Sequence, residues 1–177
     1  MGTDFAGKYA GQFLSMPDRF KEIYMKYLYS KIIEQDGKLR IFVDCIGLPT
    51  ECESPIEQIL WLALNIYSLE TENHYVFLEQ SEVNANGNNY RVDFLYCEDY
   101  MDDIKNPFYL AIECDGHEFH EKTKQQVDRR NKRDMDLKME GIDVLHFSGS
   151  KIYKEPFSCA EEICNYIAKK IEERKNE

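Results

Sequence analysis

Residues 108–114, Phe-Tyr-Leu-Ala-Ile-Glu-Cys, form an apolar run that a single charged residue, Glu113, interrupts. A short run that is apolar on both faces predicts a strand at a central position in a sheet, because both of its faces must be covered. Unpaired carboxylates are rarely buried, so Glu113 is hard to explain as a purely structural residue. This stretch therefore predicts the centre of the fold and also marks where chemistry is expected.

Three further strands and one long helix surround this central strand in the sequence. Asn84-Ala85-Asn86-Gly87-Asn88 is a strong turn signal that joins two strands as a hairpin, because its Asn-Gly pair tolerates positive φ. A polar helix separates the last two strands, and a helical crossover usually joins parallel neighbours. The predicted strands are 75–80, 90–97, 108–114 and 142–147, and the predicted crossover helix is 121–140.

Helices are expected before and after these strands. Ser54-Pro55-Ile56-Glu57 combines an N-cap serine, a proline at N1 and a glutamate at N3, and it opens a helix to Leu69 that is apolar almost all round. A last helix is predicted to open at Ser158, with Glu161 three residues on. Residues 51–177 thus predict an α/β core with the order helix, three-strand meander, crossover helix, strand, helix.

Residues 1–50 are predicted to form an N-terminal helical extension to this core. Ser15, followed by Pro17 and Asp18, indicates a helix start, and this tyrosine-rich helix runs to about Gln35. The segment 39–45 fits a short strand. A length of 177 residues suits one domain with an extension of this kind.

Charge is distributed unevenly along the chain. The formal net charge of −11 argues against a general nucleic-acid coat protein, which would be basic. Residues 120–138, however, hold seven Lys or Arg against four Asp or Glu. Such a local basic face is enough to contact phosphates, so an acidic nuclease is not excluded.

The cysteines and the apolar runs indicate a cytoplasmic protein. None of the six cysteines forms a CxxC pair, and several lie in apolar runs, so reduced thiols that act as small hydrophobic residues are expected. No stretch reaches the roughly 18 consecutive apolar residues that a membrane span needs. The N-terminus also lacks the pattern of a signal peptide.

Three carboxylates are predicted at or near strand ends. Glu113 and Asp115 lie two residues apart, so they point to one face if the strand continues that far. The hairpin strand brings Asp93 beside them. Neighbouring carboxylates repel each other and are costly to desolvate, and a hard divalent cation such as Mg²⁺ offsets both costs. The alternatives are a solvated strand residue for Asp93 and a turn residue before Gly116 for Asp115.

The order of several short motifs resembles the PD-(D/E)xK nuclease superfamily, and within it the branch that contains the very-short-patch repair endonuclease. The similarity covers roughly residues 53–165. Any one motif is weak, but their order and spacing together are fairly specific. The matching segments are Glu53–Gln58, Tyr90–Phe94, Ile112–His120, Asp128–Asp134 and Gly141–Leu145.

This resemblance implies a restriction-endonuclease-like core and a role for four residues. Asp93 resembles the metal-binding aspartate of the family, and Glu113 resembles the first acid of its (D/E)xK strand. The carbonyl of Cys114 is implied to complete the metal shell. Glu57 resembles a helix glutamate that many members add to the site, but Ser54 and Glu57 also form a complete capping box, and both roles are compatible.

The chain departs from the family where a lysine is expected, because Asp115 stands there. Aspartate cannot donate the cationic hydrogen bonds that lysine gives to the scissile phosphate and the attacking water. Histidines that follow this strand assist the very-short-patch branch, which implies a similar role for His117 or His120, with Lys122 and Gln125 as further candidates. The alternative for each histidine is a solvated loop residue.

The crossover helix has a polar face that recurs every three or four residues. Its N-terminus follows the metal strand, and helix N-termini attract phosphate. The functional interpretation is a clamp on the nucleic-acid backbone, and the alternative is a solvated charged face. The residues of this face are Lys122, Gln125, Arg129, Lys132 and Arg133.

The sequence therefore predicts a nuclease that uses Mg²⁺ or Mn²⁺, acts on nucleic acid with DNA as the expected substrate, and forms a homodimer if it cuts both strands. Two other classes stay open: a nuclease fold that binds nucleic acid without catalysis, and a protein-binding module that uses the tyrosine-rich helix. Cys114, His117 and His120 also have zinc-ligand residue types but lack a fourth ligand. His74, His146 and Trp61 are interpreted as structural residues.

Overall fold

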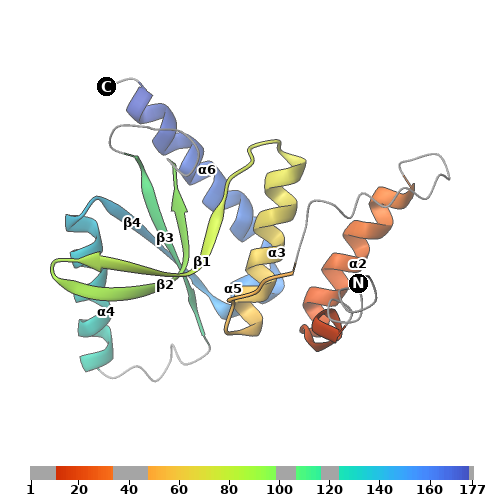
Figure 1. Ribbon diagram of the computed structural model, residues 1–177, viewed down its shortest axis with the longest axis horizontal. Coiled ribbons are helices and arrows are strands. Elements are labelled where there is room, and N and C mark those ends of the chain that lie inside the picture. The colour runs from red at the N-terminus through yellow and green to blue at the C-terminus, as the bar shows by residue number, and fades with distance from the viewer. Residues whose placement is uncertain (1–10, 34–47, 99–106, 117–123, 176–177) are drawn as a thin grey trace, which may run out of the picture.

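Four strands form one mixed sheet, with neighbours in the order of the chain (Figure 1). β1 pairs with β2 and β2 with β3 in antiparallel fashion, whereas β3 and β4 are parallel. The computed structural model describes residues 11–33, 48–98, 107–116 and 124–175. It confirms an α/β fold with a mixed sheet. The strands are β1 (Phe77–Ala85), β2 (Asn88–Cys97), β3 (Tyr109–Asp115) and β4 (Ile142–Ser148).

The β1–β2 hairpin turns at the predicted Asn-Gly pair, where Asn86 has φ 50° and Gly87 has φ 73°. The prediction that β1 ends at Gln80 is wrong. β1 continues to Ala85, because the residues after Gln80 pair with β2 from Ser81↔Val92 to Ala85↔Asn88. Val83 and Ala85 alternate with the polar Glu82 and Asn84, but this short alternation overlaps the turn signal that begins at Asn84.

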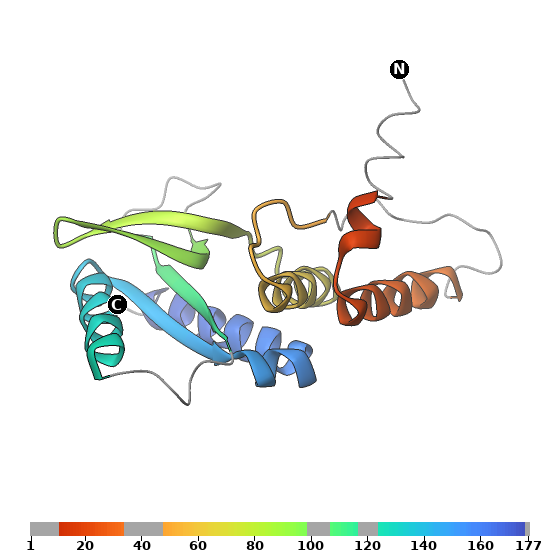
Figure 2. The same cartoon turned by 90° about the horizontal axis from the view of Figure 1, so that it is seen from below.

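Helices cover both faces of the sheet (Figure 2). α3 (Pro55–Glu70), α5 (Gly149–Lys154) and α6 (Pro156–Lys175) share one core with Ile112. On the other face, α4 (Lys124–Met139) packs its Leu137 against Ala111 and Ile142. Ala111 and Ile112 are successive strand residues and point to opposite faces, which explains why the predicted central strand is apolar throughout.

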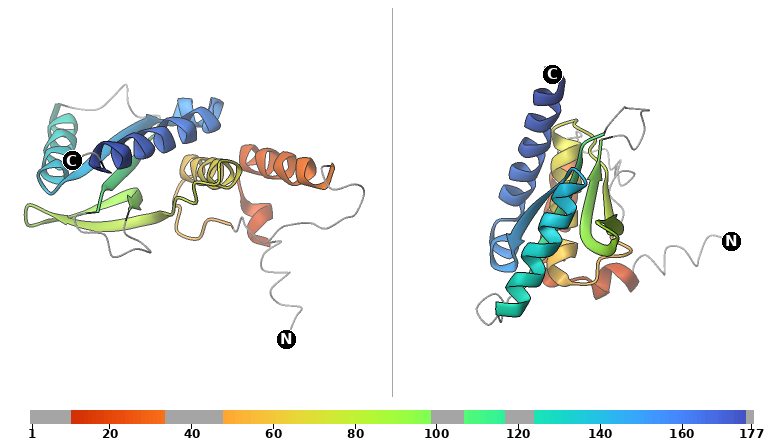
Figure 3. Two further views of the ribbon diagram at one scale, coloured as in Figure 1. Left: turned by 90° about the horizontal axis from the view of Figure 1, so that it is seen from above. Right: turned by 90° about the vertical axis from the view of Figure 1, so that its left-hand side faces the viewer.

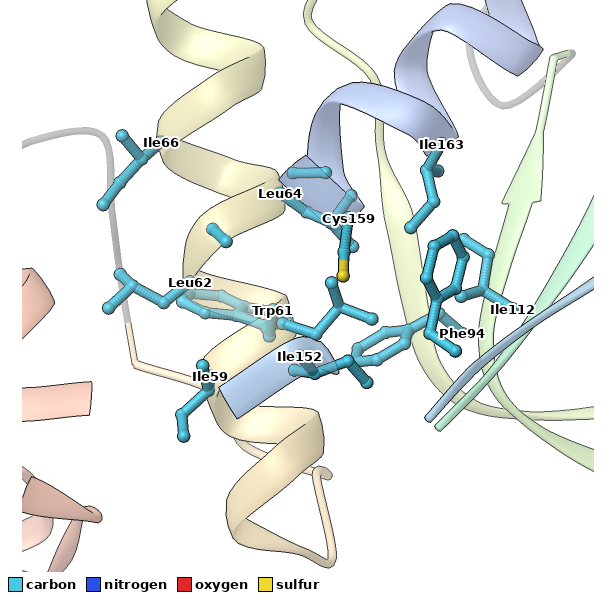
Figure 4. Close-up of a cluster of buried hydrophobic side chains, with 14 of the residues drawn as sticks. Ile59, Trp61, Leu62, Leu64, Ile66, Phe94, Ile112, Ile152, Cys159 and Ile163 are labelled. Atoms are coloured by element: carbon cyan, nitrogen blue, oxygen red, sulfur yellow. The ribbon is translucent and has the colours of Figure 1, made fainter. Parts of the chain in front are cut away.

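The larger core fills the space between the helices and the sheet (Figure 4). Leu62 and Leu64 from α3, Ile163 from α6 and Phe94 from β2 are completely buried. Trp61 is also buried, so its interpretation as a core residue is confirmed. The N-cap half of the predicted capping box is present at the start of α3, since Ser54 Oγ accepts a hydrogen bond from the Glu57 backbone N–H at 3.3 Å. The Glu57 carboxylate accepts from the backbone N–H of Glu53 rather than of Ser54.

The predicted start of the last helix at Ser158 is wrong. α6 begins at Pro156, whose fixed φ suits the first helical position, and Ser158 lies inside the first turn. The short helix α5 precedes it, with Ser148 Oγ capping the Lys151 backbone N–H. Six residues are too few for a helical pattern to stand out in the sequence.

The N-terminal helix α2 (Asp18–Ile33) packs on α3, on the side away from the sheet (Figures 1 and 3). It begins at Asp18 rather than at Ser15, because residues 11–15 form a separate helical turn. Phe20, Ile23 and Tyr24 are buried in the larger core. The predicted strand 39–45 lies outside the described residues.

Within the described ranges, no helix is long and apolar enough to cross a membrane. Five cysteines belong to these ranges, and all five are free thiols: Cys52, Cys97, Cys114, Cys159 and Cys164.

Candidate functional site

Asp93 and Glu113 lie on neighbouring strands at the same end of the β2–β3 pairing. This pairing runs from Cys97↔Tyr109 to Phe94↔Ile112, so Asp93 and Glu113 are the next residues on their strands. Asp93 Oδ2 accepts a hydrogen bond from the Cys114 backbone N–H at 2.7 Å. The backbone of β3 therefore fixes the Asp93 carboxylate next to the strand that carries Glu113.

Gln80 joins Asp93 to Glu57, the acid predicted on the helix. Its Nε2 donates to Glu57 Oε2 at 2.8 Å and lies 3.5 Å from Asp93 Oδ1. Gln80 has φ 46° in the middle of β1, a left-handed conformation that is strained for a non-glycine residue in a strand. The sequence gives no signal for Gln80, because positive φ at a glutamine cannot be read from residue type.

Burial raises the pKa of both central carboxyls. Glu113 is 8% exposed, and the loss of water raises its pKa to about 7 even though its ion pair with Arg133 acts in the opposite direction. Burial likewise raises the pKa of Asp93, while the hydrogen bond from Cys114 lowers it. Two carboxyls that resist ionisation, side by side, form a place where a bound cation would be stabilised.

Asp115, at the position of the family lysine, contacts two basic side chains. Its Oδ2 lies 3.4 Å from Arg130 Nη1 and 3.2 Å from His146 Nδ1. His146 Nε2 lies 3.0 Å from Asp134 Oδ2, so the imidazole bridges two aspartates. His146 is predicted from the sequence to be structural, but the parallel pairing of β3 with β4 puts it opposite Glu113.

A pocket of about 590 Å³ opens above these residues. Its acidic side is formed by Glu113 and Asp115 from β3, beside His146 from β4. Its basic side comes entirely from α4. The basic residues that line it are Arg129, Arg130, Lys132 and Arg133.

The predicted basic face of α4 is present in part. Arg129, Lys132 and Arg133 line the pocket, whereas Gln125 is exposed and does not. Arg133 points at Glu113 instead of at solvent, and Arg130 is a contact that the sequence analysis did not select. The predicted site residues His117, His120 and Lys122 lie outside the described residues.

Asp136 ties the tip of the β1–β2 hairpin to α4. This buried carboxylate accepts hydrogen bonds from Tyr90 Oη at 2.5 Å, Lys132 Nζ at 2.8 Å and Asn86 Nδ2 at 3.0 Å. Lys132, then Tyr90 and Asn86, lower the pKa of Asp136 to about 2. The carboxylate is therefore ionised at any physiological pH. We call these four residues, Asp136, Tyr90, Lys132 and Asn86, the hairpin latch.

The donor set at the end of β2 and β3 fits a hard divalent cation. Asp93 and Glu113 offer carboxylate oxygens, the ligands that Mg²⁺ prefers, and burial disfavours their charged forms until a cation is present. Among the described residues, no three His, Cys, Asp or Glu side chains are already gathered as a complete metal site. Asp115 instead faces His146 and Arg130.

Comparisons with known proteins give no functional assignment. No protein-family model matches the chain, and no curated protein matches its sequence. The chain is similar to a solved structure titled "Crystal Structure of Protein of Unknown Function AF1548", with 15% sequence identity and a TM-score of 0.31. That similarity covers 51% of this chain and 46% of the other, so the chain spans about half the length of that protein.

Proposed function

We propose that this protein is a metal-dependent nuclease that hydrolyses phosphodiester bonds, with DNA as the expected substrate. One observation carries the proposal: the buried carboxyl of Glu113 lies on the strand next to the half-buried Asp93, and Glu113 lines a pocket whose opposite wall is rich in arginine and lysine. A cation on the carboxylates and basic side chains opposite them suit a ligand with several negative charges. A nucleic-acid backbone is such a ligand.

Asp93 and Glu113 would hold Mg²⁺ or Mn²⁺ through their carboxylates, and the Cys114 carbonyl is a further candidate ligand. The bound ion would polarise the phosphate and lower the pKa of a bound water. Gln80 keeps the Glu57 carboxylate close to Asp93 by donating to Glu57 and lying beside Asp93 Oδ1. Glu57 is thereby held where it supports the site from α3.

The basic residues of α4 would hold the charge of the substrate. Arg133 contacts Glu113 and is the cationic group nearest to the proposed metal ligands among the contacts described above. It is therefore the candidate for the part that the family assigns to a lysine on the strand. Arg129 is exposed at the pocket and is available for a phosphate further from the reacting bond.

Asp115 and His146 lie in close contact beside this site, with His146 Nδ1 3.2 Å from Asp115 Oδ2. Asp134 contacts the other ring nitrogen of His146, so the orientation of the imidazole is fixed from both sides. In this arrangement Asp115 positions His146 and Arg130. His120 and Lys122 stay predicted helpers for water activation and phosphate binding.

A second candidate is a nucleic-acid-binding module that kept the nuclease fold without catalysis. The ion pair between Arg133 and Glu113 favours it, because a metal would have to compete with a guanidinium for the same carboxylate. The aspartate at the lysine position favours it as well. Metal-dependent cleavage separates the two candidates.

The test is cleavage of labelled single-stranded, duplex, mismatched and branched DNA, together with RNA, in Mg²⁺, in Mn²⁺ and in chelator. Asp93→Asn keeps the shape of the side chain and removes the charge, so it is expected to lower the rate at least 100-fold. Asp128→Asn is the matched control, because Asp128 is an exposed residue of α4.

Metal-dependent cleavage that Asp93→Asn abolishes and Asp128→Asn retains would support the nuclease. Cleavage that survives Asp93→Asn would point to a contaminating enzyme. No cleavage of any substrate, with salt-sensitive binding intact, would instead support the binding module.

A further inference from the structure

The pocket beside the proposed catalytic carboxylates has three walls. α4 contributes the basic wall, and the ends of β3 and β4 contribute Glu113, Asp115 and His146. The third wall is the β2 side of the hairpin, where Asn88 and Tyr90 line the pocket. Glu113 is almost completely buried, so a phosphate that reaches it from this side must enter the pocket.

The hairpin latch fixes two of these walls to each other. Asp136 on α4 binds Tyr90 and Asn86 on the hairpin, and the Asn86 backbone N–H also donates to Glu140 Oε1 at 3.2 Å. Apolar side chains pack together behind the latch, since Ala85 and Leu137 are completely buried in the smaller core. The hairpin and α4 therefore form one unit at this end of the pocket.

The volume of the pocket suits a nucleotide. About 590 Å³ lies within the roughly 300–1,000 Å³ of pockets that take small ligands. A duplex is wider than its major groove alone, which is about 12 Å wide. A single strand therefore fits between the latched hairpin and α4 more readily than a paired helix does.

The chemistry of the walls matches an unpaired nucleotide. Sites for single strands combine basic side chains that follow the backbone with aromatic rings that stack on bases. Here Arg129 and Arg130 supply the charge, and Tyr90 supplies a ring whose hydroxyl is held by Asp136. Asn88 adds an amide, which can both donate to and accept from a base edge.

We infer that this pocket binds an unpaired segment of nucleic acid, with a base on Tyr90 and its phosphates toward Arg129 and Arg130. The substrate of the proposed nuclease is then a single strand or an unpaired flap, and a continuous duplex is a poor substrate. The cleavage part of this inference rests on the proposed function, whereas the binding part does not.

Binding is measured separately from cleavage. A fluorescein-labelled DNA strand, the same strand in a duplex, and an RNA strand of the same sequence are titrated with the full chain, and fluorescence anisotropy gives each Kd. The titrations are run in chelator and again in Ca²⁺, a hard cation with the same preference for oxygen ligands. The DNA and RNA strands distinguish the two sources of an unpaired nucleotide.

Three variants test the role of the ring. Tyr90→Leu removes the ring and is expected to weaken single-strand binding roughly tenfold, while Tyr90→Phe keeps the ring and most of the affinity. Tyr153→Leu is the matched control, because Tyr153 is 53% exposed on α5 and does not line the pocket. Arg129→Gln gives an independent check, because it is expected to reduce the salt dependence of binding and leaves the latch intact.

The unpaired strand is expected to bind at least tenfold more tightly than the duplex. Duplex binding that equals or exceeds it, no binding of any strand, or equal affinities for Tyr90→Leu and Tyr153→Leu would overturn the inference. Single strands that bind tightly and are never cut would sustain the inference and contradict the proposed hydrolysis. A duplex that is bound and cut as well as the single strand would support the proposed hydrolysis and contradict the inference.

Discussion

Glu113 makes the folded protein sensitive to pH. Burial raises its pKa from the ordinary 4.5 to about 7, so the folded state binds a proton more tightly than the unfolded chain does. Between these two pH values the folded state holds more protons, and stability therefore falls as pH rises. The stability that the protonated Glu113 contributes to the folded state is fully present below the unfolded pKa of 4.5 and is lost above about pH 7.

Glu113→Gln removes this titration, because the amide has no proton to lose. From pH 5 to pH 8, the unfolding free energy of the wild type is expected to fall by about 2–3 kcal/mol relative to that of the variant. Urea unfolding at several pH values measures the difference. Arg133 loses its partner in the variant, but this cost is constant over the range, so a difference that does not change with pH would contradict the prediction.

Gln80 separates two carboxylates, and its substitution tests how crowded the site is. Gln80→Glu puts a third carboxylate between Glu57 and Asp93. Like-charge repulsion is expected to destabilise the protein by about 1–3 kcal/mol at pH 8, a shift in Tm of several degrees. Added Mg²⁺ is expected to reduce the shift. Gln125→Glu makes the same change on an exposed surface, and an equal shift there would contradict the prediction.

The candidate site could be predicted from the sequence only in part. Glu113 stands out because it interrupts an apolar strand, and Asp93 and Glu57 follow from the motif order. Gln80 and His146 could not be found this way. Gln80 depends on a backbone conformation that its residue type disfavours, and His146 depends on the register between two strands that a helix separates.

At the scale of the elements, Glu79 holds the chain that leads into α3. Its Oε2 accepts hydrogen bonds from three successive backbone N–H groups, those of Thr50 at 3.1 Å, Glu51 at 2.8 Å and Cys52 at 3.0 Å. Three donors that converge on one carboxylate oxygen form an anion nest. This contact fixes the entry to the helix that carries Glu57, so β1 helps to orient the site from a distance.

Glu79→Ala leaves these three N–H groups without their shared acceptor. Hydrogen bonds to a charged group contribute about 1.5–3 kcal/mol, so a loss of roughly 2–3 kcal/mol in unfolding free energy is expected. Glu79→Gln keeps a neutral acceptor and is expected to lose less. Glu82→Ala is the control, because Glu82 is an exposed residue of the same strand. Equal stability of the two alanine variants in urea would refute the role of the nest.

The elements themselves follow from the sequence more closely than their ends do. The apolar strand 108–114, the Asn-Gly hairpin and the N-cap at Ser54 each have a local cause, and the structure contains all three. The start of α6 has no such cause, and the end of β1 overlaps the turn signal that begins at Asn84. β1 extends through pairing with β2, and α6 begins at a proline beyond a helix too short to recognise.

At the scale of the whole molecule, acidic and basic side chains are distributed unevenly. The chain carries a net charge of −11, yet the pocket wall made by α4 carries four basic side chains, three of which pair with acidic residues. An acidic surface repels nucleic acid in general, and a local basic wall attracts it at one place. For the proposed nuclease, this distribution favours a substrate that reaches the pocket over one that coats the surface.

The N-terminal helix α2 contributes to the stability of the folded protein. Phe20 is completely buried, and its ring stacks on Tyr24 with centroids 6.0 Å apart in the core that α2 shares with α3. The sequence suggested an extension to the core domain. The shared core predicts instead that α2 unfolds together with the sheet, in a single cooperative transition.

Phe20→Ala tests this cooperation directly. Removing a buried phenylalanine costs about 3–5 kcal/mol, and the whole unfolding transition is expected to move by that amount. Met25→Ala is the control on the same helix, because Met25 is 54% exposed. Unfolding is followed by circular dichroism and by the fluorescence of Trp61, which lies on α3. If Phe20→Ala left the Trp61 transition in place, α2 would be an independent appendage. A joint shift of both signals means that residues of the extension stabilise the helix that carries Glu57.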